Sequence, residues 1–224
     1  MELRRREEIV MKKVLLISST FLLCTWILTS CAAMFGYVAK YDISLSSVES
    51  PIDAGEQYGE TKVMQHVEDG TTKYSYEDDY IETTWFVGST QFFFTLRNKS
   101  NHSLKINWDD ISYVDIYGNV GRVMHSGVKY TDRNNSQPST TIPRNAKISD
   151  ILLPTDNVYY VSGQYGGWRE KLLIPSNYQT QEDYNNNASK LIGKTMTIMM
   201  PIIIEGVQND YSFIFSIDDL IQND

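Results

Sequence analysis

Three histidines, His66, His102 and His125, are the side chains best suited to acid–base or metal chemistry in this chain of 224 residues. None belongs to a zinc-binding spacing such as HExxH. His102 lies in a polar turn, so we expect a solvated side chain there. His125 lies in the stretch RVMHSGVKY, and we expect a buried or partly buried imidazole with a structural role. A hydrolase whose site is assembled from distant residues stays open as an alternative.

The acidic residues form no recognisable catalytic or metal-binding motif. Adjacent carboxylates such as Asp109 and Asp110 point to opposite faces of a strand, whereas glycoside hydrolysis needs two carboxyls that face one cleft. Together with Asp115 they also lack the spacing of an EF-hand. The sequence has no GxSxG elbow, and GQYGG at 163–167 matches neither type of phosphate-binding loop. We therefore predict a protein that is not an enzyme, with no catalytic residues, no metal and no cofactor.

Aromatic residues give the one positive indication of binding. The stretch VYYVSGQYGGW at 158–168 places Tyr160, Tyr165 and Trp168 on or beside a glycine-rich loop. Exposed rings pack against protein partners and stack on sugars, so these three are the candidate ligand-binding residues. The alternative is burial, because a sandwich core commonly contains a tryptophan and several tyrosines. Trp108 alternates with Leu104 and Ile106, and we expect it in the core.

The N-terminal 30 residues have the features of a secretory signal peptide. Basic residues occur among the first 13, an uncharged hydrophobic run follows at 14–28, and small residues come next. Met11 begins a complete signal of its own, so translation starts at Met1 or at Met11. The uncharged length between Lys13 and Lys40 is also long enough to span a bilayer, and a transmembrane helix is the alternative.

The hydrophobic run ends in Leu28-Thr29-Ser30-Cys31, which resembles the lipobox of bacterial lipoproteins. The resemblance implies that Cys31 becomes the first residue of the mature chain and carries acyl chains that hold the protein on a lipid bilayer. Two or more chains anchor a protein stably, whereas one is marginal. No aspartate follows the cysteine, which in a Gram-negative host implies the outer membrane, and we favour its periplasmic face. The other cysteine, Cys24, lies in the peptide that would be removed.

The rest of the chain predicts a lipidated tether at 31–58 and one antiparallel β-sandwich at 59–224. Short strand-like runs recur between turn signals, and strands alternating with long helices are absent from the pattern. A first short strand around Ile43, Leu45 and Val48 is possible within the tether. Pro201 interrupts a hydrophobic run and predicts a sheet edge or a bulge. The runs that we assign to strands lie at 72–81, 91–96, 104–108, 112–117, 120–124, 148–153, 158–161, 168–174, 195–204 and 211–217, with one weak helix at 181–191.

Parts of this region resemble known bacterial domains. The stretch FFFTLRNKSNHSLKINW at 92–108 resembles the core hairpin of small immunoglobulin-like accessory domains of secreted bacterial proteins. Residues 85–175 are similar, in weaker motifs, to a group of uncharacterised bacterial lipoproteins. The resemblance implies an immunoglobulin-like antiparallel β-sandwich and implies no particular activity.

The net charge of −8 disfavours nucleic acid as a partner, because phosphate binding needs a basic surface. We therefore predict a bacterial envelope lipoprotein with a non-enzymatic interaction module that contacts envelope proteins or glycans. A carbohydrate-binding accessory protein of a glycan uptake system is an alternative to this function.

Overall fold

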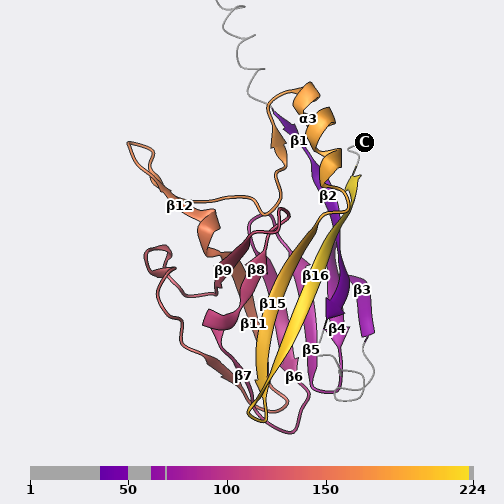
Figure 1. The fold of residues 1–224 in the computed structure, drawn as a ribbon, viewed down its shortest axis with the longest axis vertical. Coiled ribbons are helices and arrows are strands. Elements are labelled where there is room, and N and C mark those ends of the chain that lie inside the picture. Colours follow the sequence, from indigo (N-terminus) through magenta and orange to yellow (C-terminus); the bar gives the residue numbers. More distant parts are fainter. Residues whose placement is uncertain (1–35, 50–61, 69, 222–224) are drawn as a thin grey trace, which may run out of the picture.

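The computed structural model describes residues 36–49, 62–68 and 70–221. Twelve of its strands join into one antiparallel sheet that folds over itself as a two-layer β-sandwich (Figure 1). The predicted mainly β, antiparallel sandwich is thereby confirmed. Its immunoglobulin-like class stays a prediction.

One layer is built around the long hairpin β15–β16, which pairs with β2 on one side and with β7 and β8 on the other. Its strands are β2 (Lys40–Glu49), β7 (Leu104–Ile106), β8 (Ser112–Val114), β9 (Val120–Met124), β10 (Thr140–Ile142), β15 (Thr195–Ile204) and β16 (Val207–Ile221). The second layer contains β3 (Lys62–Glu68), β4 (Thr71–Glu77), β5 (Ile81–Val87), β6 (Phe92–Asn98) and β11 (Lys147–Pro154).

Strand β11 joins the two layers. Residues 147–152 pair with β6, and Leu153 and Pro154 then pair with Met124 and Val123 of β9. A strand that changes partner in this way forms a corner between two packed sheets. The sheet is therefore continuous through β11.

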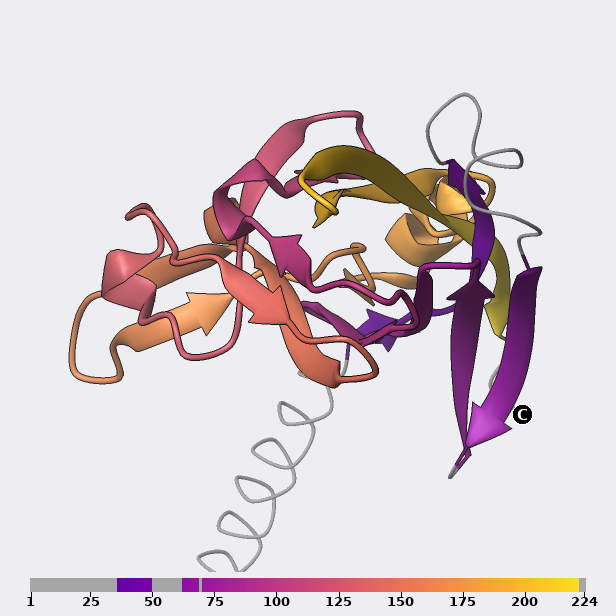
Figure 2. The same cartoon turned by 90° about the horizontal axis from the view of Figure 1, so that it is seen from below.

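The remaining elements are short and lie at the ends and sides of the sandwich (Figure 2). They are β1 (Tyr37–Val38) paired with β14 (Asn177–Tyr178), the hairpin β12 (Val158–Val161) and β13 (Gly167–Glu170), helix α3 (Gln181–Asn187), and the 3-10 helices η2 (Trp108–Asp110), η3 (Tyr130–Asp132), η4 (Thr155–Asn157) and η5 (Ser189–Leu191). Helix α3 and η5 match the helix predicted at 181–191. Across the described residues, no helix has the length and hydrophobicity to cross a membrane.

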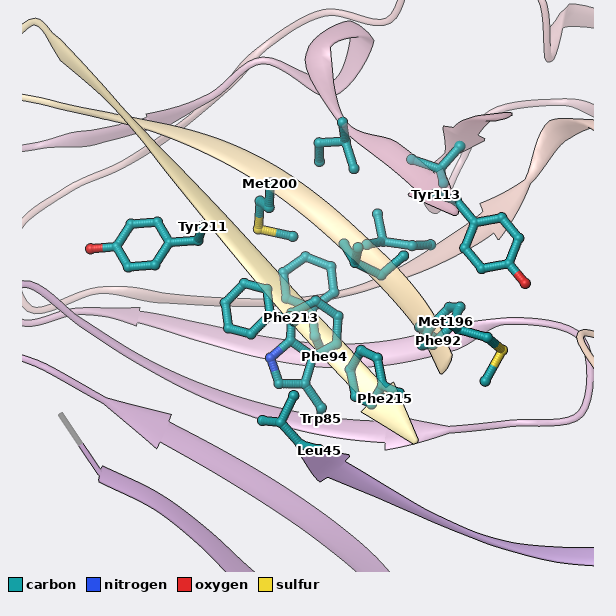
Figure 3. Close-up of a cluster of buried hydrophobic side chains, with 14 of the residues drawn as sticks. Leu45, Trp85, Phe92, Phe94, Tyr113, Met196, Met200, Tyr211, Phe213 and Phe215 are labelled. Carbon is teal, nitrogen blue, oxygen red and sulfur yellow. The ribbon is translucent and has the colours of Figure 1, made fainter. Parts of the chain in front are cut away.

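Aromatic side chains from both layers meet in the core (Figure 3). The Trp85 ring of β5 lies 4.7 Å from the Phe213 ring of β16 and 5.1 Å from the Phe94 ring of β6, centroid to centroid. Phe92 contacts Phe215 at 5.1 Å in the same way. These rings are fully or almost fully buried. Large aromatic side chains contribute strongly to the burial of apolar area, and they are what holds the two sheets together.

The predicted tether at 31–58 is wrong for the described residues 36–49. These residues form β1 and β2, and β2 pairs with β16 from Lys40 to Glu49. Leu45 is buried in the main core, so this segment contributes to the sandwich itself. The short strand predicted around Ile43, Leu45 and Val48 is therefore part of a longer strand, β2.

The predicted hairpin at 92–108 is also wrong, because β6 and β7 belong to different layers and do not pair. Asn98 organises the connection between them. Its buried amide nitrogen donates to the carbonyls of His102 at 2.6 Å and Ile142 at 3.0 Å. Its amide oxygen accepts the backbone N–H and the hydroxyl of Ser100. The segment therefore crosses from one sheet to the other around a satisfied buried amide.

Candidate binding surface on the β12–β13 hairpin

The hairpin β12–β13 projects from the side of the sandwich (Figures 1 and 2). It forms a separate two-stranded sheet in which Tyr160 lies opposite Trp168 and Val158 lies opposite Glu170. Directly opposed residues of an antiparallel pair point to the same face. One face of the hairpin therefore presents Val158, Tyr160, Trp168 and Glu170.

Trp168 fixes this face to the body of the protein. Its ring contacts the rings of Tyr160 and Tyr130 edge to face, at centroid distances of 5.5 Å and 5.9 Å. The Arg133 guanidinium lies 5.2 Å from the ring centroid, a cation–π contact. Trp168 is half-buried and packs on a small cluster that includes Val158. The Trp168 ring thus packs between the hairpin and the body of the protein, and much of the ring is unavailable to a ligand.

Glu170 adds polar contacts at the base of the hairpin. Its carboxylate accepts hydrogen bonds from the hydroxyls of Tyr130 and Thr90, the latter at 2.6 Å. The hydrogen bond to Glu170, helped by burial, raises the pKa of Tyr130 above its ordinary value. The base is therefore attached to two separate parts of the body, the η3 segment and the turn between β5 and β6.

The tip of the hairpin is fixed by its own backbone. Gly166 donates its N–H to the Gly163 carbonyl at 2.9 Å, and a Cβ at Gly166 would lie 2.5 Å from the Val161 oxygen. Only glycine fits there. Arg169 donates to the backbone carbonyls of Tyr165 and Trp168 at 3.1 Å and 2.9 Å. These contacts hold the backbone of Tyr165 in one place.

The tip and outer face present exposed apolar side chains. Tyr165 is 85% exposed and Tyr160 is 61% exposed, and Tyr159 and Val161 on the outer face are also exposed. Exposed aromatic groups on a preorganised support are typical of the anchor residues of protein interfaces. Of the three predicted binding residues, Tyr160 and Tyr165 are accessible, whereas Trp168 acts mainly as their support.

Sequence reasoning missed the residues that position this surface. Tyr130, Arg133 and Glu170 lie outside the 158–168 stretch and reach the hairpin through tertiary contacts. Tyr159, which period-2 alternation places on the face opposite Tyr160, was also not predicted as a binding residue, and it is exposed.

His125 is partly buried, as predicted, and its ring stacks on Trp108 at 4.2 Å with an interplanar angle of 9°. Its Nδ1 atom lies 3.3 Å from Asp150 Oδ2, while Asp150 Oδ1 accepts the Ser126 N–H at 2.8 Å. The backbone N–H of His125 donates to the Gln137 side chain. These contacts join β9, β11 and the 133–140 segment, which is a structural role. No serine or threonine hydroxyl hydrogen-bonds the His125 ring in the part of the chain that the structure describes.

The other predicted features lie apart from the hairpin. His102 is exposed, and its Nε2 lies 3.0 Å from Glu205 Oε1. Asp109 is engaged by Arg122, Ser136 and Gln137. Within the described ranges, no three His, Cys, Asp or Glu side chains gather in a way that could hold a metal ion. Cys31 and the signal segment at 1–30 lie outside the described residues.

Comparisons with known proteins add little to this picture. No protein-family model matches the chain, and no curated protein is significantly similar to it. Among solved structures, the X-ray structure of Northeast Structural Genomics Consortium target SoR45 matches with 14% sequence identity and a TM-score of 0.25. The match covers 79% of this chain and 84% of that chain. At that TM-score the similarity says nothing about function.

Proposed function

We propose that this protein is a lipid-anchored bacterial envelope protein that works as a non-enzymatic interaction module. On this proposal the β12–β13 hairpin binds another envelope protein. The observation that supports it best is Tyr165, which is 85% exposed on a tip whose backbone is held by Arg169 and by the Gly163–Gly166 turn. A residue whose backbone is already held loses less conformational entropy on binding than one on a mobile loop.

A protein partner is favoured over a glycan because the exposed rings lie on a projecting arm. Tyr160 and Tyr159 point to opposite faces of the hairpin, so they do not form one flat platform for a sugar. An arm with apolar groups on both faces and at its tip suits insertion between parts of a protein partner. The immunoglobulin-like class of the sandwich is part of the same proposal, supported by its two packed antiparallel layers.

The anchor is proposed to be Cys31, through its lipobox. The first described residue, Gly36, lies beside Tyr178, next to the β1–β14 pair. Five residues of chain span at most about 18 Å. A lipid on Cys31 would therefore keep the β1–β14 end of the sandwich close to a bilayer, on the periplasmic face of the outer membrane. The hairpin would extend sideways from the body toward neighbouring proteins (Figure 1).

Metabolic labelling with a fatty-acid probe tests the anchor. We expect label in the wild type and in Cys24→Ala, whose cysteine lies in the peptide that is removed, and none in Cys31→Ala. Equal labelling of the wild type and Cys31→Ala would refute lipidation at Cys31. Loss of label in Cys24→Ala alone would point to attachment at Cys24 instead of Cys31.

Site-specific photocrosslinking tests the hairpin. A photoreactive residue at position 165 is expected to crosslink to one envelope protein in intact cells, whereas one at Val207, an exposed residue in the β15–β16 hairpin, is not. The partner, once purified, should bind Tyr165→Ala at least about tenfold more weakly than the wild type. Unchanged affinity for Tyr165→Ala would overturn the assignment. Binding to a glycan array that depends on Tyr165 would favour the carbohydrate-binding alternative instead.

A further inference from the structure

A cavity of about 270 Å³ lies at one end of the sandwich, between the β8–β9 hairpin and residues 171–175. Tyr113, Ile116, Leu173 and Pro154 contribute apolar walls, and Asp156 and Lys171 belong to its lining as well. Ligand-binding pockets usually measure about 300–1,000 Å³, so this one is suited to a small ligand. It is separate from the exposed rings of the β12–β13 hairpin.

The cavity is open because a glycine faces a tyrosine across two strands. Tyr113 of β8 lies directly opposite Gly121 of β9, so both positions point to the same side of the sheet. A Cβ atom added at Gly121 would lie 3.7 Å from Asp156 Oδ2 and would contact no other atom of the described residues outside its chain neighbours. Glycine within a strand often marks a place where a ligand approaches the backbone closely.

The Tyr113 side chain has an unused hydrogen-bonding group. It is 4% exposed, and its hydroxyl has no hydrogen-bond partner among the described residues. Its oxygen points away from Trp85 and Phe213 in the core (Figure 3). Burial, with a smaller effect from Asp115, raises the pKa of Tyr113, so the group is a neutral phenol that can donate and accept. Buried polar groups in folded proteins are nearly always paired, and an unpaired one calls for a partner.

The rim offers polar groups that are free to bind. The Asp156 carboxylate and the Lys171 ammonium are exposed and have no hydrogen-bond or ion-pair partner in the described part of the chain. The Asp115 carboxylate is already occupied by the N–H groups of Tyr117 and Asn119, each at 2.8 Å. The two free charged groups, Asp156 and Lys171, are thus one acceptor and one donor whose charges cancel. The exposed Tyr117 ring adds an aromatic wall.

We propose that this cavity binds a small neutral polyhydroxylated ligand the size of a single sugar ring. One ligand hydroxyl pairs with the Tyr113 hydroxyl, and others bond Asp156 and Lys171 at the rim. A neutral ligand fits better than a zwitterion, because the buried end of the cavity provides an uncharged phenol and the two charged groups lie in solvent, where they attract ions weakly.

Ligand-observed NMR with the full-length protein tests this proposal, using glucose, galactose, mannose and N-acetylglucosamine as probes and dialanine as the zwitterionic comparison. We expect at least one sugar to bind the wild type and dialanine not to bind. Gly121→Leu, which fills the cavity, should abolish the signal. Tyr113→Phe should weaken binding about three- to tenfold, the effect of one hydrogen bond. Val207→Ala, at an exposed residue that does not line the cavity, should bind like the wild type.

Three results would overturn the proposal: no sugar binds the wild type, a sugar binds Gly121→Leu as well as the wild type, or dialanine binds in place of the sugars. Circular dichroism of each variant separates loss of binding from loss of folding, and Tyr113→Phe keeps the ring that packs on Phe92. Because the hairpin function depends on Tyr165, failure of either proposal leaves the other intact.

Discussion

Asp78 Oδ2 accepts the Tyr211 hydroxyl at 2.9 Å, which joins the turn between β4 and β5 to β16 in the opposite layer. The same carboxylate accepts the Tyr76 hydroxyl at 3.1 Å and the backbone N–H groups of Tyr80 and Ile81 at 2.8 Å. Asp78 is only 1% exposed. A buried carboxylate is tolerated here because four donors surround it.

Asp78→Ala is expected to lower the free energy of unfolding by about 3 kcal/mol or more, because it removes four hydrogen bonds from a buried turn at once. Asp78→Asn, which keeps one acceptor oxygen, should cost less. Urea denaturation measures both. The neighbouring Asp79 is exposed, so Asp79→Ala should stay within about 0.5 kcal/mol of the wild type. A small effect of Asp78→Ala would mean that this carboxylate does not join the layers.

Asp109 should make the stability depend on pH in the acid range. A hydrogen bond from Ser136 lowers its pKa, with help from Gln137 and Arg122 and against the opposing effect of burial. A lowered folded-state pKa stabilises the fold above the unfolded value of about 3.9, and this contribution is lost as the pH falls through the folded value. Asp109→Asn should therefore cost about 1–2 kcal/mol at pH 7.

Denaturation of the wild type and Asp109→Asn at a series of pH values checks this. The difference between them should shrink steadily as the pH falls below about 4. Asp132→Asn, at an exposed aspartate, serves as the control. A difference that is constant from pH 7 to pH 3 would show that the carboxylate charge of Asp109 contributes nothing.

Tyr113→Phe should stabilise the unliganded protein by about 1 kcal/mol, because it removes a buried hydroxyl that has no partner among the described residues. Tyr76→Phe makes the same chemical change at a hydroxyl that bonds Asp78, and it should destabilise by a similar amount. Thermal denaturation compares the two. Destabilisation by Tyr113→Phe would show that its hydroxyl is satisfied in solution.

Substitutions of Trp168 and Tyr165 should distinguish the residue that supports the hairpin from the residue that binds a partner. Tyr165→Ala is expected to leave the free energy of unfolding within about 0.5 kcal/mol of the wild type, because the side chain is exposed. Trp168→Ala removes the contacts with Tyr130 and Arg133, and it should cost about 1–2 kcal/mol. Hydrogen exchange should rise at 158–170 in Trp168→Ala and stay slow in β5 and β6. Equal exchange in both variants would contradict the supporting role of Trp168.

Local pattern was enough to predict much of the sandwich. The period-2 alternation of Leu104 and Ile106 placed both in the core, and the runs assigned to strands at 112–117 and 120–124 contain the paired strands β8 and β9. Burial of Trp108 and partial burial of His125 also follow from their neighbours in sequence. These features depend on residues within a few positions of one another, which is the range over which a pattern can be read.

Pairing between distant segments was decided by the tertiary structure. Pro201 predicted an edge or a bulge, yet β15 is central, and Pro201 lies at the gap where its neighbour changes from β8 to β7. The polar, serine-rich run at 40–49 read as a tether because its strand pattern is weak, and it is held in the sheet by β16, some 170 positions away in the chain. Sheet membership depends on hydrogen bonds to a partner strand, which a single sequence does not specify.

The same division holds for function. The sequence by itself determined the acidic charge, the run Leu28-Thr29-Ser30-Cys31 that resembles a lipobox, and the presence of aromatic residues at 158–168. Only the tertiary structure decided that Trp168 supports the hairpin while Tyr165 faces solvent, and that Gly121 leaves space beside Tyr113. Exposure and cavity shape arise from contacts between elements far apart in the chain, so composition and spacing cannot fix them.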